Sequence, residues 1–340
     1  MVEHWSPKPG VVGSSPASPA IFCCQKICYN ALMTIEDLER IRLTYKEKKD
    51  KIKKNFLTIY AIILGFILLA VLSSQGFSRS SFGFTFFMPT IIAFIQPTIF
   101  VFVGYIIVSS FATRKEAVDY RNAYKSYFVS TTMNKVFTNL KYSHEWGMPR
   151  SVLADTEMVN TGDRYTSNDY CVAKYKDFPF MQADVHIQVE SEDSDGNRTY
   201  NTIFRGRWIT FDIKKKFEKK LLVAGKGFHC ERHDKTFKKI ELESNEFNRM
   251  FDVYSQDGFE AFYLLDPAVM ERIMRLSELH DGRVMVCFDK GKMHIAINNN
   301  VDSFEPASIN SPIDEKAEFD KVMNDIKVVT NIIDEVKLVK

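Results

Sequence analysis

Two long apolar stretches stand out in the first third of the chain. No residue between Lys54 and Arg79 is charged, and residues 56–72 read FLTIYAIILGFILLAVL, which is apolar on every face. A second uncharged stretch covers residues 80–113, with its apolar centre at 86–111. A bilayer core about 30 Å thick is spanned by about 20 helical residues. The pattern therefore predicts two transmembrane helices, over residues 55–74 and 87–111.

The second apolar stretch contains three residues that a membrane helix tolerates poorly, namely Pro89, Gln96 and Pro97. Pro97 removes a backbone hydrogen bond, so we expect a kink there. The amide of Gln96 needs a hydrogen-bonding partner in hydrocarbon, so we expect it to face the other helix or a second copy of the chain. Neither stretch contains an ionisable residue, so a channel would require many copies to form an ion path.

Basic residues lie on both outer sides of the predicted spans. They are Arg40, Arg42, Lys46, Lys48, Lys49, Lys51, Lys53 and Lys54 before the first span, and Arg114, Lys115, Arg121 and Lys125 after the second. The connection between the spans holds only Arg79. The positive-inside rule then predicts that both termini are cytoplasmic. Residues 33–54 are expected to form a basic juxtamembrane helix, with the flank from Arg40 to Lys54 lying against an anionic leaflet.

The first 32 residues differ from the rest of the chain. They are rich in Pro, Gly and Ser and show no apolar period, so we do not expect them to fold alone. The character changes at Met33, where Thr34 followed by Asp37 is typical of a helix N-terminus. Two interpretations remain open for residues 1–32: a disordered tail, or a gene-model artefact that precedes a true start at Met33.

A helical period follows the second span. Apolar and aromatic residues recur at three, four or seven positions from Ala117 to Leu140, and Gly147 and Pro149 end the pattern. We therefore expect a stalk helix over residues 113–142. Its apolar face would dock on the following domain or pair with another copy.

Residues 150–340 predict an α+β domain with a mainly antiparallel sheet and flanking helices. Strand patterns cover residues 171–175, 180–190, 199–212, 221–228, 283–289 and 292–298. A turn at residues 193–197 joins the second and third of these into a hairpin. Helical patterns cover residues 245–251, 267–279 and 313–338. Asp266 is expected to cap the middle helix, with Pro267 in its first position.

Charge and cysteine usage narrow the class of protein. The formal net charge of the 340 residues is +2, so the chain lacks the basic excess of nucleic-acid-binding proteins. Three of the six cysteines, Cys23, Cys24 and Cys28, precede Met33. The other three, Cys171, Cys230 and Cys287, are widely spaced. Free thiols in a reducing compartment explain this spacing better than a disulfide framework does.

A short polar cluster, His229-Cys230-Glu231-Arg232-His233, is the strongest metal candidate. Zinc accepts such side chains, but no second ligand pair stands at a matching spacing, so a polar loop is the preferred interpretation. The isolated histidines, namely His144, His186, His280 and His294, predict packed or surface side chains.

Carboxylates and glycines offer further candidates. Asp163 and Asp169 bracket Arg164-Tyr165 and are interpreted as solvating a loop, while Asp193 and Asp195 belong to the predicted turn. Gly225-Lys226-Gly227 is too short for a nucleotide loop. The two guanidinium groups of Arg205-Gly206-Arg207-Trp208 could bind an anion or a lipid headgroup. A glycine within a strand, however, usually marks a bulge. No catalytic, cofactor-binding or metal-binding residue is assigned, and no cofactor is expected.

Several segments together resemble the bacterial domain of unknown function numbered 3137. They are Phe204-Arg205-Gly206, residues 240–247, 251–254, 256–257 and 261–267, Val269-Met-Glu-Arg272 and Phe304-Glu-Pro306. The resemblance covers about residues 33–338, including the two spans and the Asp169 region. It implies a bacterial inner-membrane protein with a cytoplasmic domain, and it supplies no activity and no catalytic residues.

The same motif residues also have a packing interpretation. Phe247 and Phe251 are four residues apart on a short helix and should be buried together. Tyr254, Phe259, Phe262 and Leu264 suit strands on either side of Asp257-Gly258.

The sequence therefore favours a multi-pass protein of the bacterial inner membrane that presents an interaction or scaffold domain to the cytoplasm. The alternatives are an enzyme at the membrane surface, such as a hydrolase, and a component of an oligomeric channel. The expected partners are the anionic leaflet and a membrane or cytoplasmic protein, together with further copies of the chain. Nucleic acid is not expected as a partner.

Overall fold

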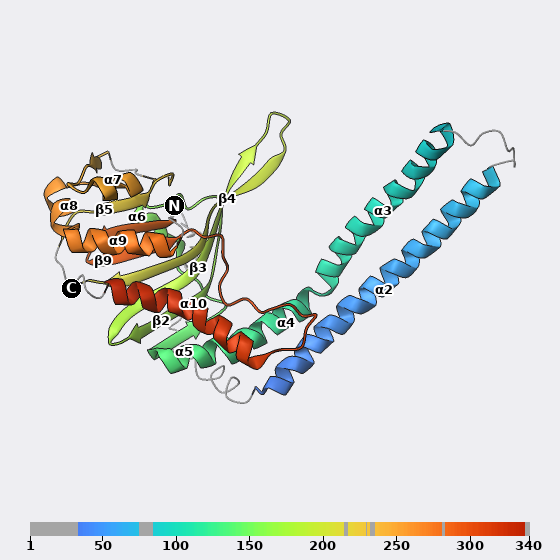
Figure 1. Cartoon of the computed structure of the whole chain (residues 1–340), viewed down its shortest axis with the longest axis horizontal. Helices are drawn as coiled ribbons and strands as arrows, with labels where there is room; N and C mark the ends of the chain where they lie inside the picture. The colour runs from blue at the N-terminus through green and yellow to red at the C-terminus, as the bar shows by residue number, and fades with distance from the viewer. Residues whose placement is uncertain are drawn as a thin grey trace, which may run out of the picture.

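The computed structural model describes residues 33–74, 84–213, 217–228, 230–231, 235–280 and 283–336. Two long helices, α2 (Ile35–Ser74) and α3 (Phe84–Ala112), precede a nine-stranded antiparallel sheet with flanking helices. Figure 1 shows these two helices projecting as a hairpin from one end of the sheet domain. The predicted α+β fold, with two apolar helices before the sheet, is confirmed.

The helix α2 joins the predicted juxtamembrane helix and the first span into one helix of 40 residues. The Thr34 hydroxyl accepts a hydrogen bond from the Asp37 N–H, and the Asp37 carboxylate accepts one from the Thr34 N–H. This reciprocal pair satisfies two backbone donors that the first turn would otherwise leave free. The predicted helix start at this point is confirmed.

Segments of both helices are long and apolar enough to cross a membrane. These segments are Ile35–Leu69 and Ile95–Ala112, and almost none of their most apolar residues are buried inside the protein. An apolar helix of a soluble core would be covered by other elements, whereas these surfaces are open. The helix α3 continues through Pro97 as far as Ala112, and the side chain of Gln96 is exposed.

The prediction of one helix over residues 113–142 is wrong at its C-terminal end. The helix consists of α4 (Arg114–Tyr124), a π-helical turn η1 (Lys125–Val129) and α5 (Ser130–Val136). Phe137 is extended, and β1 (Thr138–Ser143) then pairs with the next strand. The apolar spacing continues to Leu140, but pairing with a neighbouring strand overrides this local helical period.

The sheet has the order β1-β2-β3-β4-β9-β8-β5-β7-β6, and its recorded pairs are all antiparallel. The strands after β1 are β2 (Arg164–Tyr175), β3 (Phe178–Glu192), β4 (Arg198–Asp212), β5 (Leu221–Gly225), β6 (Lys238–Ile240), β7 (Phe251–Ser255), β8 (Val284–Asp289) and β9 (Lys292–Ile297). The predicted β3–β4 hairpin is present, and β8 and β9 form a second hairpin. The tip of the β3–β4 hairpin extends beyond the neighbouring strands (Figure 1).

One strand is much longer than its sequence pattern predicts. Residues 171–175 were expected to be a short strand and residues 163–169 a loop, but β2 begins at Arg164 and pairs with β3 along most of its length. Its polar first half has no apolar alternation to reveal it. A bulge between Asn168 and Cys171 separates this half from the apolar half.

The remaining helices are α6 (Arg150–Thr156), α7 (Asn245–Met250), α8 (Gly258–Leu264), α9 (Pro267–Leu279) and α10 (Glu315–Val336). The Asp266 carboxylate accepts a hydrogen bond from the Val269 N–H at 3.0 Å, which confirms the predicted cap of α9. The prediction of a strand at Phe259, Phe262 and Leu264 is wrong. Asp257 caps a helix there, and Ala261 and Leu264 form its buried face.

Two hydrophobic cores lie on the two faces of the sheet. The larger core includes residues of α4, η1, α9 and α10, together with Leu38 from the start of α2. The smaller core is built around Trp208, with Leu153 of α6 and Cys230 among its members. Phe247 and Phe251 are both buried in the larger core with ring centroids 4.7 Å apart, as predicted, but Phe251 begins β7 and does not lie on the helix. The first turns of α2 are thus part of the packed domain.

Candidate functional site

The helix that leaves the apolar hairpin meets the sheet at a buried charged cluster. The chain passes from α4 into the π-turn η1 at Lys125, whose side chain is 2% exposed. A π-turn carries a wider hydrogen-bonding ring than an α-helix and is often found at functional sites. The Lys125 ammonium lies 2.6 Å from Oδ2 of Asp169 and 2.8 Å from Oε1 of Glu305.

Asp169 is held by the bulge in β2. Its φ angle is 55°, a left-handed conformation that costs energy for a residue other than glycine. Its Oδ1 accepts a hydrogen bond from the Tyr142 hydroxyl of β1 at 2.5 Å, and its Oδ2 accepts one from Asn168 at 2.8 Å. The bulge therefore directs the carboxylate at the helix and gives it several donors.

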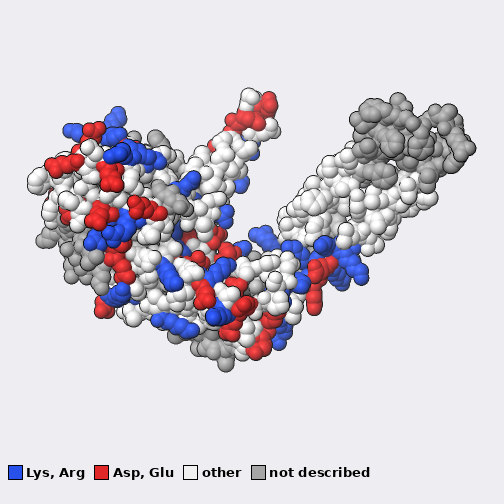
Figure 2. Space-filling view, viewed as in Figure 1, with Lys and Arg blue, Asp and Glu red and all other residues white. Residues whose placement is uncertain are grey.

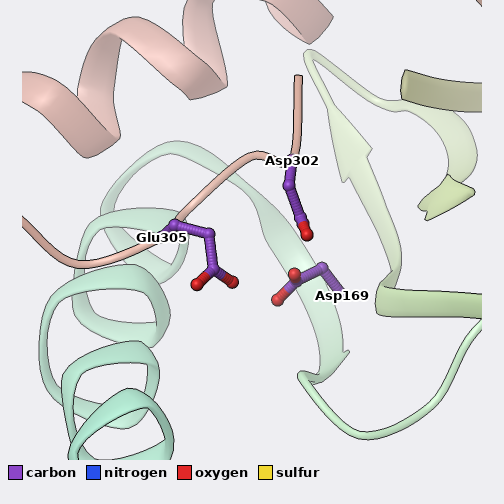
Figure 3. Close-up of side chains that lie close together, drawn as sticks. All are labelled: Asp169, Asp302 and Glu305. Atoms are coloured by element: carbon purple, nitrogen blue, oxygen red, sulfur yellow. The ribbon is translucent and has the colours of Figure 1, made fainter. Parts of the chain in front are cut away.

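The third part of the cluster is the segment between β9 and α10. Glu305 also binds the Arg121 guanidinium at 2.9 Å, while Asp302 lies 3.6 Å from the guanidinium of Arg205. Figure 3 shows Asp302 and Glu305 pointing toward Asp169 from this segment. A buried pair behind them, Asp184 and Arg207, fixes the segment, because Asp184 accepts a hydrogen bond from the Ser303 N–H at 2.6 Å.

Burial dominates the electrostatics of these groups. It raises the pKa of Asp169 to about 7, against the attraction of Lys125. Burial opposes the charged form of Lys125, but Asp169 and Glu305 outweigh it, so the pKa of the ammonium is raised. Burial also raises the pKa of the Tyr142 hydroxyl well above its usual value, with Asp169 as the next cause. Lys125 and Tyr142 thus stay protonated at neutral pH, while the carboxyl group of Asp169 changes its protonation state close to pH 7.

The spacing of the carboxylates resembles a cation site. Asp169, Asp302 and Glu305 each offer an oxygen, and the three oxygens lie within 4.8 Å of one another. The Lys125 ammonium binds two of the three residues and supplies the positive charge that they require. A metal ion would have to displace this buried lysine, so we assign the cluster a structural role: it ties the helix that follows the spans to the sheet.

The clefts that the described residues form include a smaller and a larger one beside the sheet. The smaller, about 290 Å³, lies beside the charged cluster and includes Arg121, His144 and Asn168 in its lining. The larger, about 910 Å³, lies near Ile203 of β4 and also contacts Lys226 and Phe228. Neither cleft gathers the sequence candidates into a catalytic arrangement among these residues.

The predicted polar cluster at residues 229–233 is described only in part, because His229, Arg232 and His233 lie outside the described residues. Cys230 is buried in the smaller core, and Glu231 accepts a hydrogen bond from Asn160 at 2.7 Å. Cys171 and Cys287 are also free and buried, in agreement with the prediction of free thiols for these three residues. The other three cysteines lie outside the described residues.

The isolated histidines lie apart from one another. His294 is buried beside Trp208, and its ring nitrogen lies 3.0 Å from the Thr210 hydroxyl. Burial lowers the pKa of His294 to about 4. His186 is hydrogen-bonded to Thr202 at 2.9 Å. His280 follows the end of α9.

The remaining sequence candidates have local structural roles. Asp163 accepts a hydrogen bond from the Glu190 N–H, and Asp193 accepts two from the backbone of its own turn, at Asp195 and Asn197. Lys226, between Gly225 and Gly227, forms an ion pair with Asp252 at 2.5 Å. The two guanidinium groups of Arg205-Gly206-Arg207 are directed at Asp302 and Asp184. Both guanidinium groups are therefore engaged in internal ion pairs, which does not favour the alternative of an anion or lipid headgroup site there.

Several basic residues do not have the role that the sequence predicted. Lys125 was assigned to the membrane flank but is buried in the cluster. Arg42 is 2% exposed and donates to the Ile309 carbonyl and to Glu39, so it faces the domain. The exposed members of the flank are Arg40, Lys51, Lys53, Lys54, Arg114, Lys115 and Arg121. Of these, Arg40 and Arg121 form ion pairs with Asp37 and Glu305. Figure 2 shows a basic band where the apolar hairpin joins the domain.

An aromatic surface lies at the other end of the domain. Phe259 is 82% exposed, and Phe262 and Tyr263 are each 50% exposed, all on the outer face of α8. Figure 1 shows α8 at the end of the domain opposite the α2–α3 hairpin. We refer to these three side chains as the α8 surface. Clustered exposed aromatic residues are typical of protein interaction sites.

The comparisons with known proteins agree with the resemblance seen in the sequence. Residues 202–338 match the family described as "Protein of unknown function (DUF3137)". The match contains α8, Glu305 and the strands from most of β4 onward. No curated protein matches the chain.

A solved structure shows a weak likeness in shape. It is the crystal structure of the mycobacterial trehalose monomycolate transport factor A, TtfA, which is 10% identical in sequence with a TM-score of 0.32. The likeness covers 61% of this chain and 92% of that chain. A likeness of this degree says nothing about what this chain binds. Together, the family match and the two apolar helices indicate a membrane-associated protein.

Proposed function

We propose that this chain is a membrane-anchored scaffold of the bacterial inner membrane, which binds a protein partner through the α8 surface on the cytoplasmic side. The observation that carries the proposal is the exposure of Phe259, Phe262 and Tyr263 on a helix that the domain holds rigid. When a partner covers three large aromatic side chains on one short helix, their apolar surface is removed from water, and this burial favours binding.

Hydrogen bonds and core packing hold α8 in place on the domain. The Asp257 carboxylate accepts a hydrogen bond from the Phe259 N–H at 2.7 Å, and Ala261 and Leu264 anchor the inner face in the larger core. The Glu260 carboxylate also accepts hydrogen bonds from the backbone N–H groups of Glu218 and Lys219. Aromatic side chains on such a rigid helix lose little conformational entropy when a partner binds.

A protein is a better occupant of this surface than the bilayer. The helix α8 lies at the end of the domain opposite the α2–α3 hairpin (Figure 1), so the membrane that holds the hairpin is far from it. The Lys125 cluster and the Arg42 contacts fasten the domain to the base of the hairpin. We therefore assign the aromatic residues to a protein partner, and the basic band to the lipid headgroups.

The proposed orientation rests on the exposed basic band. Lys51, Lys53 and Lys54 precede the first span, and Arg114 and Lys115 follow the second. Positive residues beside a span favour the cytoplasmic side, and each contributes about 1 kcal/mol near an anionic leaflet. Cytoplasmic and periplasmic reporters fused to the C-terminus test this orientation. Activity of the periplasmic reporter would overturn it.

The interaction itself is tested by affinity purification of the tagged full chain from its own membranes in mild detergent. The test variant carries Phe259→Ser, Phe262→Ser and Tyr263→Ser. The matched control carries Trp146→Ser and Ile203→Ser, which alter exposed residues outside α8. We expect one stoichiometric protein with the wild type and the control, and its loss with the α8 variant. Equal recovery with all three chains, or recovery of the chain without any protein partner, contradicts the proposal.

A further inference from the structure

The polar side chains within the two spans provide evidence about helix pairing. The hydroxyls of Tyr60 and Thr98 lie 2.7 Å apart and join α2 to α3. The hydroxyls of Thr58 and Ser110 each donate to a carbonyl one turn earlier in the same helix, at 3.0 and 2.7 Å. The hydrogen bonds of these hydroxyl groups are all formed within one copy of the chain. Polar groups in the hydrocarbon core of a bilayer need such internal partners.

Gln96 differs from these residues. Its side chain is exposed and has no hydrogen-bonding partner among the described residues. The half-buried residues of α3 near α2 are Pro97, Val101, Gly104 and Tyr105, and the Tyr105 ring packs on Phe56 with centroids 5.6 Å apart. Gln96 lies on another face, so α2 of the same chain does not supply its partner.

The depth of Gln96 follows from the packing of the two helices. Gln96 is nine residues from Tyr105, which contacts Phe56 just beyond Lys54. At 1.5 Å per residue this is about 14 Å beyond the basic residues of α2, and the distance from Phe111 is about 22 Å. Both values fall within a hydrocarbon core about 30 Å thick. An amide at this depth is costly unless it is paired.

The neighbours of Gln96 on its own face form a continuous apolar stripe. Phe100, Val103 and Ile107 follow it at intervals of four, seven and eleven residues, and all three are exposed, Phe100 to 69%. This spacing is that of the contact positions of a helical coiled coil, in which one polar residue often fixes the register. We name these four residues the α3 stripe.

We infer that α3 pairs with α3 of a second copy along the α3 stripe, with the two Gln96 amides hydrogen-bonded to each other. Both copies insert with the same topology, so the two-fold axis is normal to the membrane and equivalent residues meet at equal depth. A carboxamide carries both donors and an acceptor, so two glutamines satisfy each other. A second copy therefore supplies the hydrogen-bonding partner that Gln96 lacks within the single chain. This pairing does not depend on a protein partner at the α8 surface.

Cross-linking in native membranes tests the geometry. Gln96→Cys is compared with Ile95→Cys, which lies at the same depth, is also exposed and points about 100° around the helix. The wild type measures the background from the natural cysteines. With a mild oxidant we expect a disulfide-linked dimer for Gln96→Cys well above both controls. Equal yields for the three chains would overturn the inference.

The energetic role of the amide is tested with Gln96→Leu, which keeps the size of the side chain but removes its hydrogen bonds. The dimer fraction is measured in lipid vesicles by energy transfer between labelled full-length chains over a range of protein-to-lipid ratios. We expect the dimerisation constant to weaken about threefold to fifteenfold, as for other interhelical hydrogen bonds. A constant unchanged by Gln96→Leu, or no dimer in the wild type, contradicts the inference.

Discussion

Lys125 and Asp169 are 44 residues apart in sequence and form a salt bridge of 2.6 Å in which both side chains are almost fully buried. Lys125 belongs to the helical segment that follows the spans, and Asp169 belongs to the sheet. The pair therefore joins the two parts of the chain. A buried pair is costly to break because the remaining charge loses both water and its partner.

Lys125→Met is expected to lower the free energy of unfolding by about 3–5 kcal/mol, because Asp169 and Glu305 lose their buried counter-charge. Urea unfolding in detergent micelles, followed by tryptophan fluorescence, measures this change. The control is Arg198→Met, which removes the exposed pair with Glu190 at 3.0 Å and should cost less than about 1 kcal/mol. Similar losses for both variants would refute a stabilising role for the buried cluster.

The same cluster predicts a pH dependence of stability. The pKa of Asp169 is raised by burial to about 7 in the folded protein, from a usual value of 3.8. The folded state then binds more protons than the unfolded state between these values, so stability falls as pH rises toward 7. Between pH 5 and pH 8 we expect a decline of about 2–3 kcal/mol that is absent in Asp169→Asn. The free energy of unfolding of both chains is measured by urea unfolding at each pH. If it changes with pH equally in the wild type and in Asp169→Asn, Asp169 does not titrate in this range.

Gly206 is predicted to be required for packing. Its φ is 155°, and a Cβ at this position would lie 2.0 Å from the Ile297 carbonyl oxygen, which is backbone and cannot move aside. Gly206→Ala should therefore cost about 2 kcal/mol or more. Gly196→Ala is the control, since Gly196 also has a positive φ but meets nothing within 4 Å. Thermal unfolding compares the two, and an equal loss of stability would mean that the backbone angle alone sets the cost.

Local signals predicted much of the fold. The Asp266 cap with Pro267 located α9, and alternation located β3, because these patterns depend on neighbours along the chain. The strand β1 was missed because its residues continue a helical period, and only pairing with β2 makes them extended. The prediction for Phe259 and Phe262 was wrong because the Asp257 cap was read as a turn between strands.

The charged cluster was not predicted from the sequence, for a different reason. Asp169 was noticed as a carboxylate, but its burial depends on Lys125 and on Glu305, which lie 44 and 136 residues away. Lys125 follows a membrane span, so its charge was attributed to the membrane flank. Glu305 lay in the Phe304-Glu-Pro306 motif without an assigned partner. Two signals pointed here: the family motif, and a lysine on the otherwise apolar face with Tyr120, Tyr124 and Phe128.

Arg42 provides the last prediction, because it links the start of α2 to the segment before α10. Its guanidinium donates to the Ile309 carbonyl and to Glu39, whose carboxylate accepts a hydrogen bond from the Ile313 N–H at 3.4 Å. Arg42→Met keeps the apolar stem but removes these donors, so the contact between α2 and the domain should loosen. Hydrogen exchange of the full chain in detergent should become faster at the backbone N–H groups of residues 305–313. Arg40→Met, which removes only the exposed pair with Asp37, should leave that exchange unchanged. Unchanged exchange in Arg42→Met would mean that the spans and the domain are held together without this arginine.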